Sequence, residues 1–578
     1  MTAGEITANG ELRPSITMAR QARVLEGLYL TLLPVTAVFV LGMSLVDQQH
    51  YVDPEFYTGY GQSFPKMYEM FGLTYYAARF PIIVVNRGSQ WLLPGLGGYA
   101  LVRFAVFLMC AVPLYVLARR HYGRPVAMAS YAFLVLNPLL PRILCWDLTT
   151  FLSIPAGFAG ITLWYLSPRT WSAAVLAAGF LFGLSINSHI FTGTAIGIFL
   201  CVELAFAARR PKGLPWFGAR VATLAAGGFL CLLFGLAFYA STVGPVSPQQ
   251  LWRITMEAVS SGHEYALTHY VPLSDYYARN YEIYVPLLTT GAAILLNGRR
   301  LLTDTLDARI TWFAASYLAA YVIAVFALRM NIVQYFWYFG HLTIVVYLAV
   351  PVILAHLAER AGARVAAWFA GTLAVVALAA TISVDAMHDV IVAASKNGAV
   401  AAAIALAAVC CLALLRTRRP RQLVSASVLL AVLVQAPFLS ATHFSVYDVH
   451  ENAGEPPLFD AIVRYRALLD KYDKTGERVR TWYRSPDRSM LSLASSNLLF
   501  TLQPPWTGNG LPLLGEAEKT HLADAATRYV LLVDPRRGRV EQGLAALRAA
   551  GIRFTPIERH TWGWDPVTMH AVLVRVER

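Results

Sequence analysis

Long apolar segments separated by short polar connections occupy most of the chain. A helix of about 20 mainly apolar residues is long enough to cross the ~30 Å hydrocarbon core of a bilayer. Residues 26–440 therefore predict an all-α polytopic membrane domain with about 13 transmembrane helices. The windows lie at 26–46, 97–118, 125–142, 148–167, 171–189, 190–208, 218–243, 281–297, 310–328, 336–357, 365–384, 399–415 and 422–440.

The basic connections between these windows all fall on one side of the predicted membrane. The positive-inside rule places short loops rich in Lys and Arg in the cytoplasm. Residues 1–25 are then a cytoplasmic N-terminus, and loops 47–96 and 244–280 lie outside, as does everything after the last window. The cytoplasmic basic connections are 118–124, 167–170, 208–213, 297–309, 358–364 and 416–422.

Residues 441–578 differ from the rest of the chain because they are more charged and show patterns of soluble elements. Helical periodicity is present at 458–473, and the segment 543–551 ends in a helix-stopping glycine. The segments 528–534 and 569–577 have the length and β-branched character of strands. We expect a small soluble extracytoplasmic α/β domain.

Composition supports a membrane protein and excludes several other classes. The chain is 57% hydrophobic and only 14% charged, whereas soluble domains are roughly 25% charged. The net charge of +13 is typical of cytoplasmic loops and contacts with anionic lipid, and no basic-aromatic cluster indicates nucleic acid. The sequence contains no Walker loop, no GxSxG elbow and no HExxH motif. We therefore expect membrane lipids, and no nucleic acid, among the partners.

Three carboxylates follow the first window, in the stretch SLVDQQHYVDPEFYTGYGQSF. Asp47, Asp53 and Glu55 are expected at the depth of the lipid head groups. Acids at the end of a span often do no more than solvate it, but ionisable groups held near a bilayer are frequently functional. We interpret these three as candidate catalytic acids.

Aromatic residues spaced by four follow the acids and predict one apolar side of a helix. Tyr and Phe at head-group depth favour an interfacial helix lying along the membrane. Pro65 is expected to break or bend this helix. The four aromatic residues are Phe56, Tyr60, Phe64 and Tyr68.

Further acids, histidines and arginines gather on the same predicted outer side. Arg142 and Asp147 lie between the third and fourth windows, and His189 ends the fifth, where a hydrogen-bonded helix-end histidine is the simpler interpretation. Spacing alone does not show a metal site, although Asp53, Asp147 and a histidine are compatible with a divalent cation. The remaining members are His263, Glu264, His269, Asp275, Arg279, Arg329 and His341.

The first outer loop resembles that of the GT-C superfamily, the membrane glycosyltransferases that use polyprenyl-phosphate sugars. Bacterial lipid A aminoarabinose transferases and protein O-mannosyltransferases belong to this superfamily. Relatives carry an Asp-Glu pair followed by Tyr; here the motif is DPEFY, with Tyr57 four residues after Asp53 and Glu55 displaced by Pro54. The YYAARFPII run at 75–83 is similar to the segment that follows this loop in bacterial members.

The resemblance implies an enzyme of the bacterial inner membrane that transfers a sugar from a polyprenyl-phosphate donor to a lipid, glycan or protein acceptor outside the cytoplasm. One carboxylate would act as general base with inversion at the anomeric carbon. Asp53 is favoured over Asp47, and Asp147 is a further candidate. Residues expected at the donor phosphate are Arg79, Arg279, Arg329, Tyr57 and His341.

Two other function classes fit parts of the pattern. A transporter or flippase would explain proline-broken spans and buried polar residues such as Asn187. A membrane scaffold that presents the C-terminal domain would explain the tail but not the acids of the first loop. The transporter is the stronger alternative, although the chain shows no paired half-repeats.

Overall fold

Each predicted apolar window overlaps a helix in the computed structural model, although α1 begins at Ile16, inside the predicted N-terminal segment 1–25. The structure describes residues 16–39, 57, 59–61, 64–93, 96–137, 139–140, 144, 150–268, 283–328, 330, 340–382, 398–435, 468, 471–473, 478–483, 510–534, 536–564 and 567–577.

The helices matching the windows are α1 (Ile16–Phe39), α6 (Leu96–Tyr122), α7 (Arg124–Leu136), α9 (Thr150–Leu166), α10 (Ala173–Ser188), α11 (Thr192–Ala208), α12 (Gly213–Thr242), α15 (Tyr284–Asn297), α16 (Leu306–Phe326), α18 (Thr343–Ala361), α19 (Arg364–Ile382), α21 (Gly398–Leu415) and α22 (Pro420–Gln435). Shorter or connecting helices are α3 (Phe64–Phe71), α4 (Tyr75–Ala78), α5 (Phe80–Leu92), α13 (Pro248–Thr268), η2 (Gly298–Leu302) and η4 (Gly340–Leu342).

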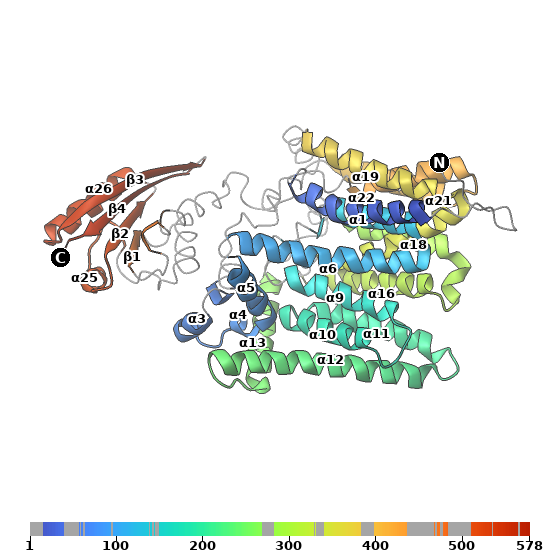
Figure 1. Ribbon diagram of the computed structural model, residues 1–578, viewed down its shortest axis with the longest axis horizontal. Helices are drawn as coiled ribbons and strands as arrows, with labels where there is room; N and C mark the ends of the chain where they lie inside the picture. Colours follow the sequence, from blue (N-terminus) through green and yellow to red (C-terminus); the bar gives the residue numbers. More distant parts are fainter. Residues whose placement is uncertain are drawn as a thin grey trace.

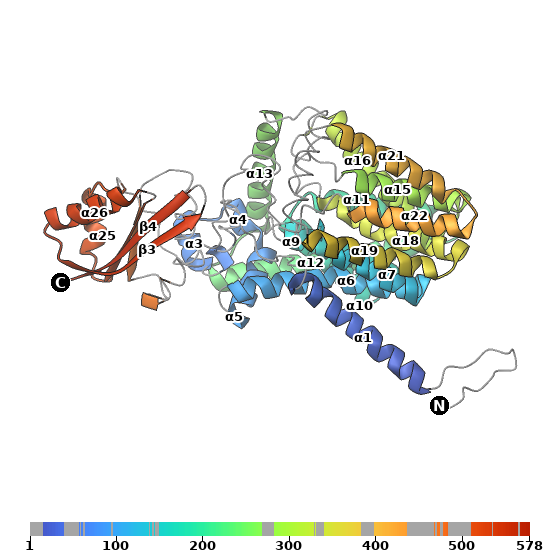
Figure 2. The ribbon, with the colours of Figure 1, turned by 90° about the horizontal axis from the view of Figure 1, so that it is seen from above.

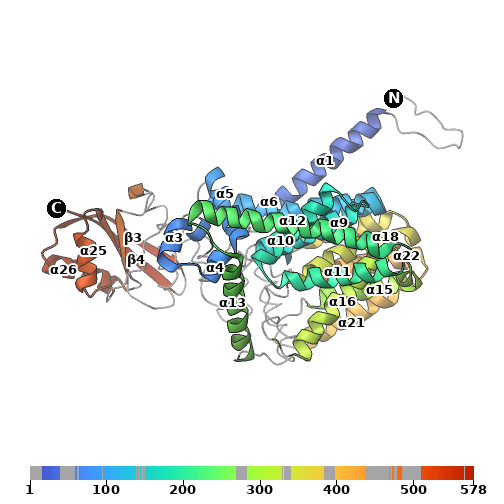
Figure 3. The ribbon, with the colours of Figure 1, turned by 90° about the horizontal axis from the view of Figure 1, so that it is seen from below.

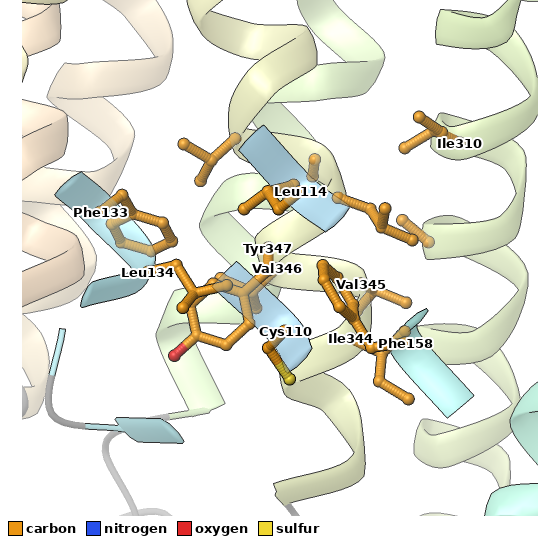
Figure 4. Close-up of a cluster of buried hydrophobic side chains, with 14 of the residues drawn as sticks. Cys110, Leu114, Phe133, Leu134, Phe158, Ile310, Ile344, Val345, Val346 and Tyr347 are labelled. Carbon is orange, nitrogen blue, oxygen red and sulfur yellow. The ribbon is translucent and has the colours of Figure 1, made fainter. Parts of the chain in front are cut away.

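The helices form a membrane bundle with α18 at its centre (Figure 1). Within the described residues, four segments are long and apolar enough to span a membrane: Ala100–Tyr122, Gly213–Thr242, Leu306–Phe326 and Gly340–Ala361. In Gly340–Ala361, which contains α18, 94% of the apolar window is buried, whereas in Gly213–Thr242, which is α12, only 28% is buried. Helix α18 is therefore central in the bundle and α12 peripheral. Figure 4 shows side chains of α6, α7 and α9 packed around α18. A polytopic helical membrane domain is thus confirmed, while the count of spans stays a prediction.

Contacts bring all six basic connections to one end of the bundle, here called the basic end. Arg119 and Arg124 pair with Glu26 at 3.2 and 3.1 Å. Other contacts join the remaining connections: Arg120 with Leu166, Arg220 with Ser167, Arg210 with Asp304, Arg300 with Glu359, and Arg360 with Leu415. This shared placement is what the positive-inside pattern requires, and the orientation of the bundle in a membrane stays a prediction.

A buried ion pair joins α11 and α16 near the basic end. Arg309 Nη1 lies 3.0 Å from Glu203 Oε2, and the Glu203 side chain is fully buried. Trp164 donates from its indole nitrogen to the same carboxylate at 2.9 Å. The guanidinium carbon of Arg220 lies over the Trp164 ring, 3.8 Å from the ring centre. Arg309 also pairs with Asp304 at 2.6 Å, so this guanidinium links α11 to the connection that precedes α16.

Glycines let α10 and α12 approach each other closely. A Cβ on Gly179 would lie 2.1 Å from the Leu224 carbonyl oxygen, and one on Gly227 would lie 2.1 Å from that of Leu176. Gly179 and Gly183 form a small-xxx-small spacing of the kind that lets membrane helices pack backbone to backbone. Only glycine fits at these contacts.

We expect Gly227→Ala to destabilise the bundle by about 1–3 kcal/mol, because the added methyl group meets backbone that cannot yield locally. Gly228→Ala is the matched control, since its nearest atom across the contact is 3.8 Å away. That control should be neutral or slightly stabilising because Ala favours helix over Gly. Thermal unfolding of the two purified variants in the same detergent compares them; equal melting temperatures would contradict the close contact.

The aromatic side of the predicted interfacial helix packs against the bundle, and its position along the membrane stays a prediction. Tyr60 and Phe64 are fully buried. The Phe64 ring packs against the rings of Phe238 and Tyr239 of α12, with ring centres 5.2 and 5.9 Å apart. Pro65 is the second residue of α3, a position in the first turn where proline is tolerated, and the predicted break or bend at Pro65 stays a prediction. The spacing of four reflects a core-facing side, which periodicity alone does not distinguish from a lipid-facing side. Phe56 lies outside the described residues.

A four-stranded sheet forms the core of the C-terminal region, in the order β1–β2–β4–β3. Its strands are β1 (Val479–Tyr483), β2 (Tyr529–Asp534), β3 (Phe554–Trp564) and β4 (Val567–Val576), with helices α25 (Glu516–Ala523) and α26 (Arg537–Ala549). β1 and β2 are parallel and the other pairs antiparallel. Residues of both helices pack on one face of the sheet. The predicted strands and the 543–551 helix are present; β1 and β3 were not predicted, and the siting of this region outside the cytoplasm stays a prediction.

Candidate functional site

Arg79 occupies the junction between α4 and α5, at the end of the bundle opposite the basic end. Thr74 caps α4 by accepting a hydrogen bond from the Ala77 amide at 3.3 Å, and Pro81 lies in the first turn of α5. These two local signals end one helix and begin the next around Arg79. The sequence TYYAARFP thereby fixes the backbone of the arginine.

Aromatic rings hold the Arg79 side chain. Its Nη1 donates a hydrogen bond to the Tyr57 hydroxyl at 2.5 Å. The guanidinium lies 5.0 Å from the Tyr75 ring centre and 5.8 Å from that of Tyr57, within the range of cation–π attraction. Tyr57 is fully buried, and its ring meets that of Tyr76 edge to face with the ring centres 5.3 Å apart. The orientation of the guanidinium is therefore set before any ligand binds.

Two buried histidines lie next to each other, and one of them, His189, is near this arginine. His189 caps the C-terminus of α10, and its ring centre is 5.3 Å from that of His341 in η4. Both rings are buried. Arg79 is close enough for its positive charge to act on the His189 imidazole. A guanidinium beside two imidazoles and a phenol offers several hydrogen-bond donors, which suits an anion such as phosphate.

The structure thus brings together three residues expected at the donor phosphate, Arg79, Tyr57 and His341, and adds His189. Helix direction explains the gathering: α10 starts and α18 ends at the basic end, so His189 and His341 both lie at the opposite end. The other candidates, Asp47, Asp53, Glu55, Asp147, Arg279 and Arg329, lie outside the described residues. Their roles stay predictions.

Sequence reasoning missed Arg103, a buried arginine near the start of α6. Its Nε donates to the Leu144 carbonyl oxygen at 3.1 Å, and its guanidinium lies 5.7 Å from the Phe151 ring centre. Leu144 belongs to the connection that carries Asp147. The signal was available, because a single arginine inside an otherwise apolar window is costly and requires a partner.

A buried amide pair anchors the same connection from its other side. Asn137 Nδ2 donates to the Val434 carbonyl oxygen at 2.9 Å, and Gln435 Nε2 donates to that of Leu136 at 2.8 Å. The Leu139 amide donates back to Asn137 Oδ1 at 3.1 Å. The segment leading to Asp147 is therefore tied to the end of α22 and to α6.

Metal ligands do not cluster in the described part of the chain: no group of three or more His, Cys, Asp and Glu side chains there could hold a metal ion. The His189–His341 pair falls short of such a group. A divalent cation involving Asp53 or Asp147 stays a prediction.

Comparisons with known proteins find similar solved structures but no matching sequence family. No family model matches the chain, and no curated protein matches it. Two solved structures of ArnT from Cupriavidus metallidurans are similar, one in the apo state and one bound to undecaprenyl phosphate. Their TM-scores are 0.42 and 0.40 at 12% identity, with 96% and 95% of this chain and 98% of each ArnT chain covered.

Proposed function

We propose that this protein is an integral membrane glycosyltransferase that uses a polyprenyl-phosphate sugar as donor. The observation that carries the proposal is the cluster of Arg79, Tyr57, His189 and His341 at the end of the bundle opposite the basic end. This end is predicted to face outward. A lipid-linked donor would present its phosphate at that depth while its chain remains in the bilayer.

Asp53, the acid expected to act as general base, is tethered to this cluster by the chain. Asp53 is four residues from Tyr57, so the two Cα atoms are within about 14 Å even in a fully extended chain. Leu144, which Arg103 holds, is three residues from Asp147, a reach of about 11 Å. The covalent chain therefore permits the Asp53 carboxylate to act at a sugar whose phosphate is bound by Arg79, while Arg103 holds the connection that carries Asp147.

The proposed reaction needs one base and one anion site. The carboxylate of Asp53 takes the proton of the acceptor hydroxyl as its oxygen attacks the anomeric carbon, and the polyprenyl phosphate leaves with the bonding electrons. Arg79 and the histidines stabilise the phosphate charge that develops. A single displacement inverts the anomeric centre. The acceptor is a lipid, glycan or protein outside the cytoplasm.

Arg79→Ala is expected to weaken donor binding about tenfold to a hundredfold, the usual effect of losing a charge-assisted hydrogen bond. Binding of a polyprenyl-phosphate probe to the purified protein in nanodiscs measures the effect. Arg253→Ala is the control, because Arg253 is an exposed cation on α13 with 72% of its side chain accessible. The Arg279→Ala and Arg329→Ala variants test the other two arginines expected at the phosphate. Normal donor binding in the Arg79, Arg279 and Arg329 variants would place the phosphate site elsewhere.

A transfer assay in detergent micelles separates the enzyme from the transporter. Micelles have no two compartments, so a transporter has no measurable activity there. Release of polyprenyl phosphate from a labelled donor together with a labelled acceptor would support the transferase. Movement of donor in sealed vesicles without any transfer would favour the transporter instead.

A further inference from the structure

Six exposed arginines at the basic end form no ion pair with a carboxylate of the described residues. The carboxylate nearest to them in the sequence, Glu359, pairs instead with Arg300 at 3.0 Å. Within the described part of the chain, the protein itself therefore leaves their positive charge without a counter-charge. The six lie where α18 meets α19 and where α21 meets α22, and are called here the arginine cluster: Arg360, Arg364, Arg416, Arg418, Arg419 and Arg421.

Other basic connections differ from the arginine cluster because acidic side chains pair with them. Glu26 pairs with both Arg119 and Arg124, on either side of the turn between α6 and α7. Asp304 pairs with Arg210, which follows α11. Membrane topology requires only that cations gather in short loops, and acids beside them do not disturb it. The missing carboxylates therefore indicate that an external anion supplies the negative charge at the arginine cluster.

Hydrogen bonds and helix packing group the arginine cluster around the start of α22. Arg360 donates from its two terminal nitrogens to the carbonyl oxygens of Leu415 and Leu296, each at 3.3 Å, which brings it beside the end of α21. α22 packs against α18, α19 and α21, and it lies between α18 and α21 (Figures 2 and 3). α18 and α21 end here, and α19 and α22 begin here. Guanidinium groups bind phosphate through paired hydrogen bonds, so such a group of arginines suits a phosphate.

An exposed row of residues on α19 leads away from the arginine cluster. Spacings of four and three residues align Arg364, Trp368, Gly371, Val375 and Leu378 along one side of the helix. Trp368, Val375 and Leu378 are 59%, 66% and 52% exposed, and a Cβ on Gly371 would meet no atom within 4 Å. The row thus passes from a cation to a tryptophan and then to apolar surface, with a gap at the glycine. This order matches a phospholipid, because phosphate, interface and acyl chain follow one another into a bilayer.

We propose that the arginine cluster binds the phosphate of an anionic phospholipid whose acyl chain lies along α19 over Gly371. The lipid belongs to the leaflet at the basic end, so the site is separate from the residues around Arg79 at the opposite end. Arginines without a counter-charge favour an anionic lipid such as phosphatidylglycerol over zwitterionic phosphatidylcholine. The proposal depends on the membrane bundle and not on the transfer reaction.

Native mass spectrometry of the full-length protein, titrated with either lipid in detergent, measures the binding. Wild-type protein should bind phosphatidylglycerol at least about tenfold more tightly than phosphatidylcholine, because a hydrogen bond to a charged group contributes about a factor of ten or more. The triple variant Arg364→Gln/Arg418→Gln/Arg421→Gln should lose this preference. Equal binding of the two lipids by the wild-type protein would overturn the proposal.

The matched control is Arg169→Gln/Arg209→Gln/Arg299→Gln, which removes three exposed arginines from the same end of the bundle but outside the arginine cluster. This control should bind phosphatidylglycerol like the wild-type protein. Equal losses in the two triple variants would show a general attraction of the basic end for anions and would refute a site. Inorganic phosphate at the same concentration should not displace the lipid; displacement would make this a site for a free anion instead.

Gly371→Leu tests the contact with the acyl chain at unchanged charge. The position is exposed and open, so leucine fits there and favours the helix more than glycine does. The new side chain fills the gap in the row and should weaken phosphatidylglycerol binding severalfold. Gly197→Leu on α11 is the control, because Gly197 is equally exposed and open. Unchanged lipid binding in Gly371→Leu, or the same loss in Gly197→Leu, would contradict the placement of the lipid along α19.

Discussion

Asp53→Asn should leave a folded, membrane-inserted protein whose sugar transfer is ~10²–10⁴-fold slower, the usual effect of removing a positioned general base. Asn keeps the size and hydrogen-bonding reach of Asp but accepts no proton at neutral pH. The variant therefore separates the chemistry from the packing of the first loop. Transfer from a purified polyprenyl-phosphate donor, measured in micelles, gives the rate.

Donor binding in the same variant provides the second measurement. Because the phosphate would be held by Arg79 and not by the acid, Asp53→Asn should bind the donor normally. Loss of rate without loss of binding is the signature of a base; equal losses of both would indicate a disturbed site.

Two other candidate acids, Asp47 and Asp147, serve as comparisons. Asp47→Asn should retain activity, because Asp47 lies at the span end without a tyrosine at the spacing of the DPEFY motif. Loss in Asp47→Asn but not in Asp53→Asn would make Asp47 the base. Loss only in Asp147→Asn would move the base to the connection held by Arg103. Full activity in all three variants would refute the proposed mechanism.

Arg309→Met should destabilise the bundle by ~3–5 kcal/mol, because it leaves the fully buried Glu203 carboxylate without this cation and also removes the Arg309–Asp304 pair. Glu203 would retain the Trp164 indole as a donor, which does not neutralise its charge. The double variant Glu203→Gln/Arg309→Met removes the unpaired buried charge and should recover the part of the loss that comes from Glu203, while the bonds to Asp304 stay lost. Chemical or thermal unfolding in detergent measures all three proteins.

Arg300→Met is the matched control for this pair. Arg300 pairs with Glu359 at 3.0 Å, but more than half of each side chain is accessible. Exposed ion pairs contribute ~0–1 kcal/mol. A loss in Arg309→Met no larger than in Arg300→Met, or a double variant as unstable as the single one, would contradict the buried pair.

Parts of the site were predictable because their signals are local. Thr74 and Pro81 mark the ends of α4 and α5, and the YYAARFPII segment drew attention to Arg79. The role of Arg103 could have been anticipated from one charge within an apolar window. The pairing of His189 with His341 had no such signal, because it depends on two helices separated by many residues in the chain.

The sequence by itself determined where the helices of the bundle lie and that the basic connections belong together, because hydrophobic length and charge are properties of continuous segments. Tertiary structure alone decided which side of an amphipathic segment is buried: Tyr60 and Phe64 face α12, whereas Trp252 and Met256 remain exposed. It also decided which charges meet, as in Glu203 and Arg309, 106 residues apart. Such contacts depend on how helices pack against one another, and close packing is set by residues on both partners, as Gly179 and Gly227 show.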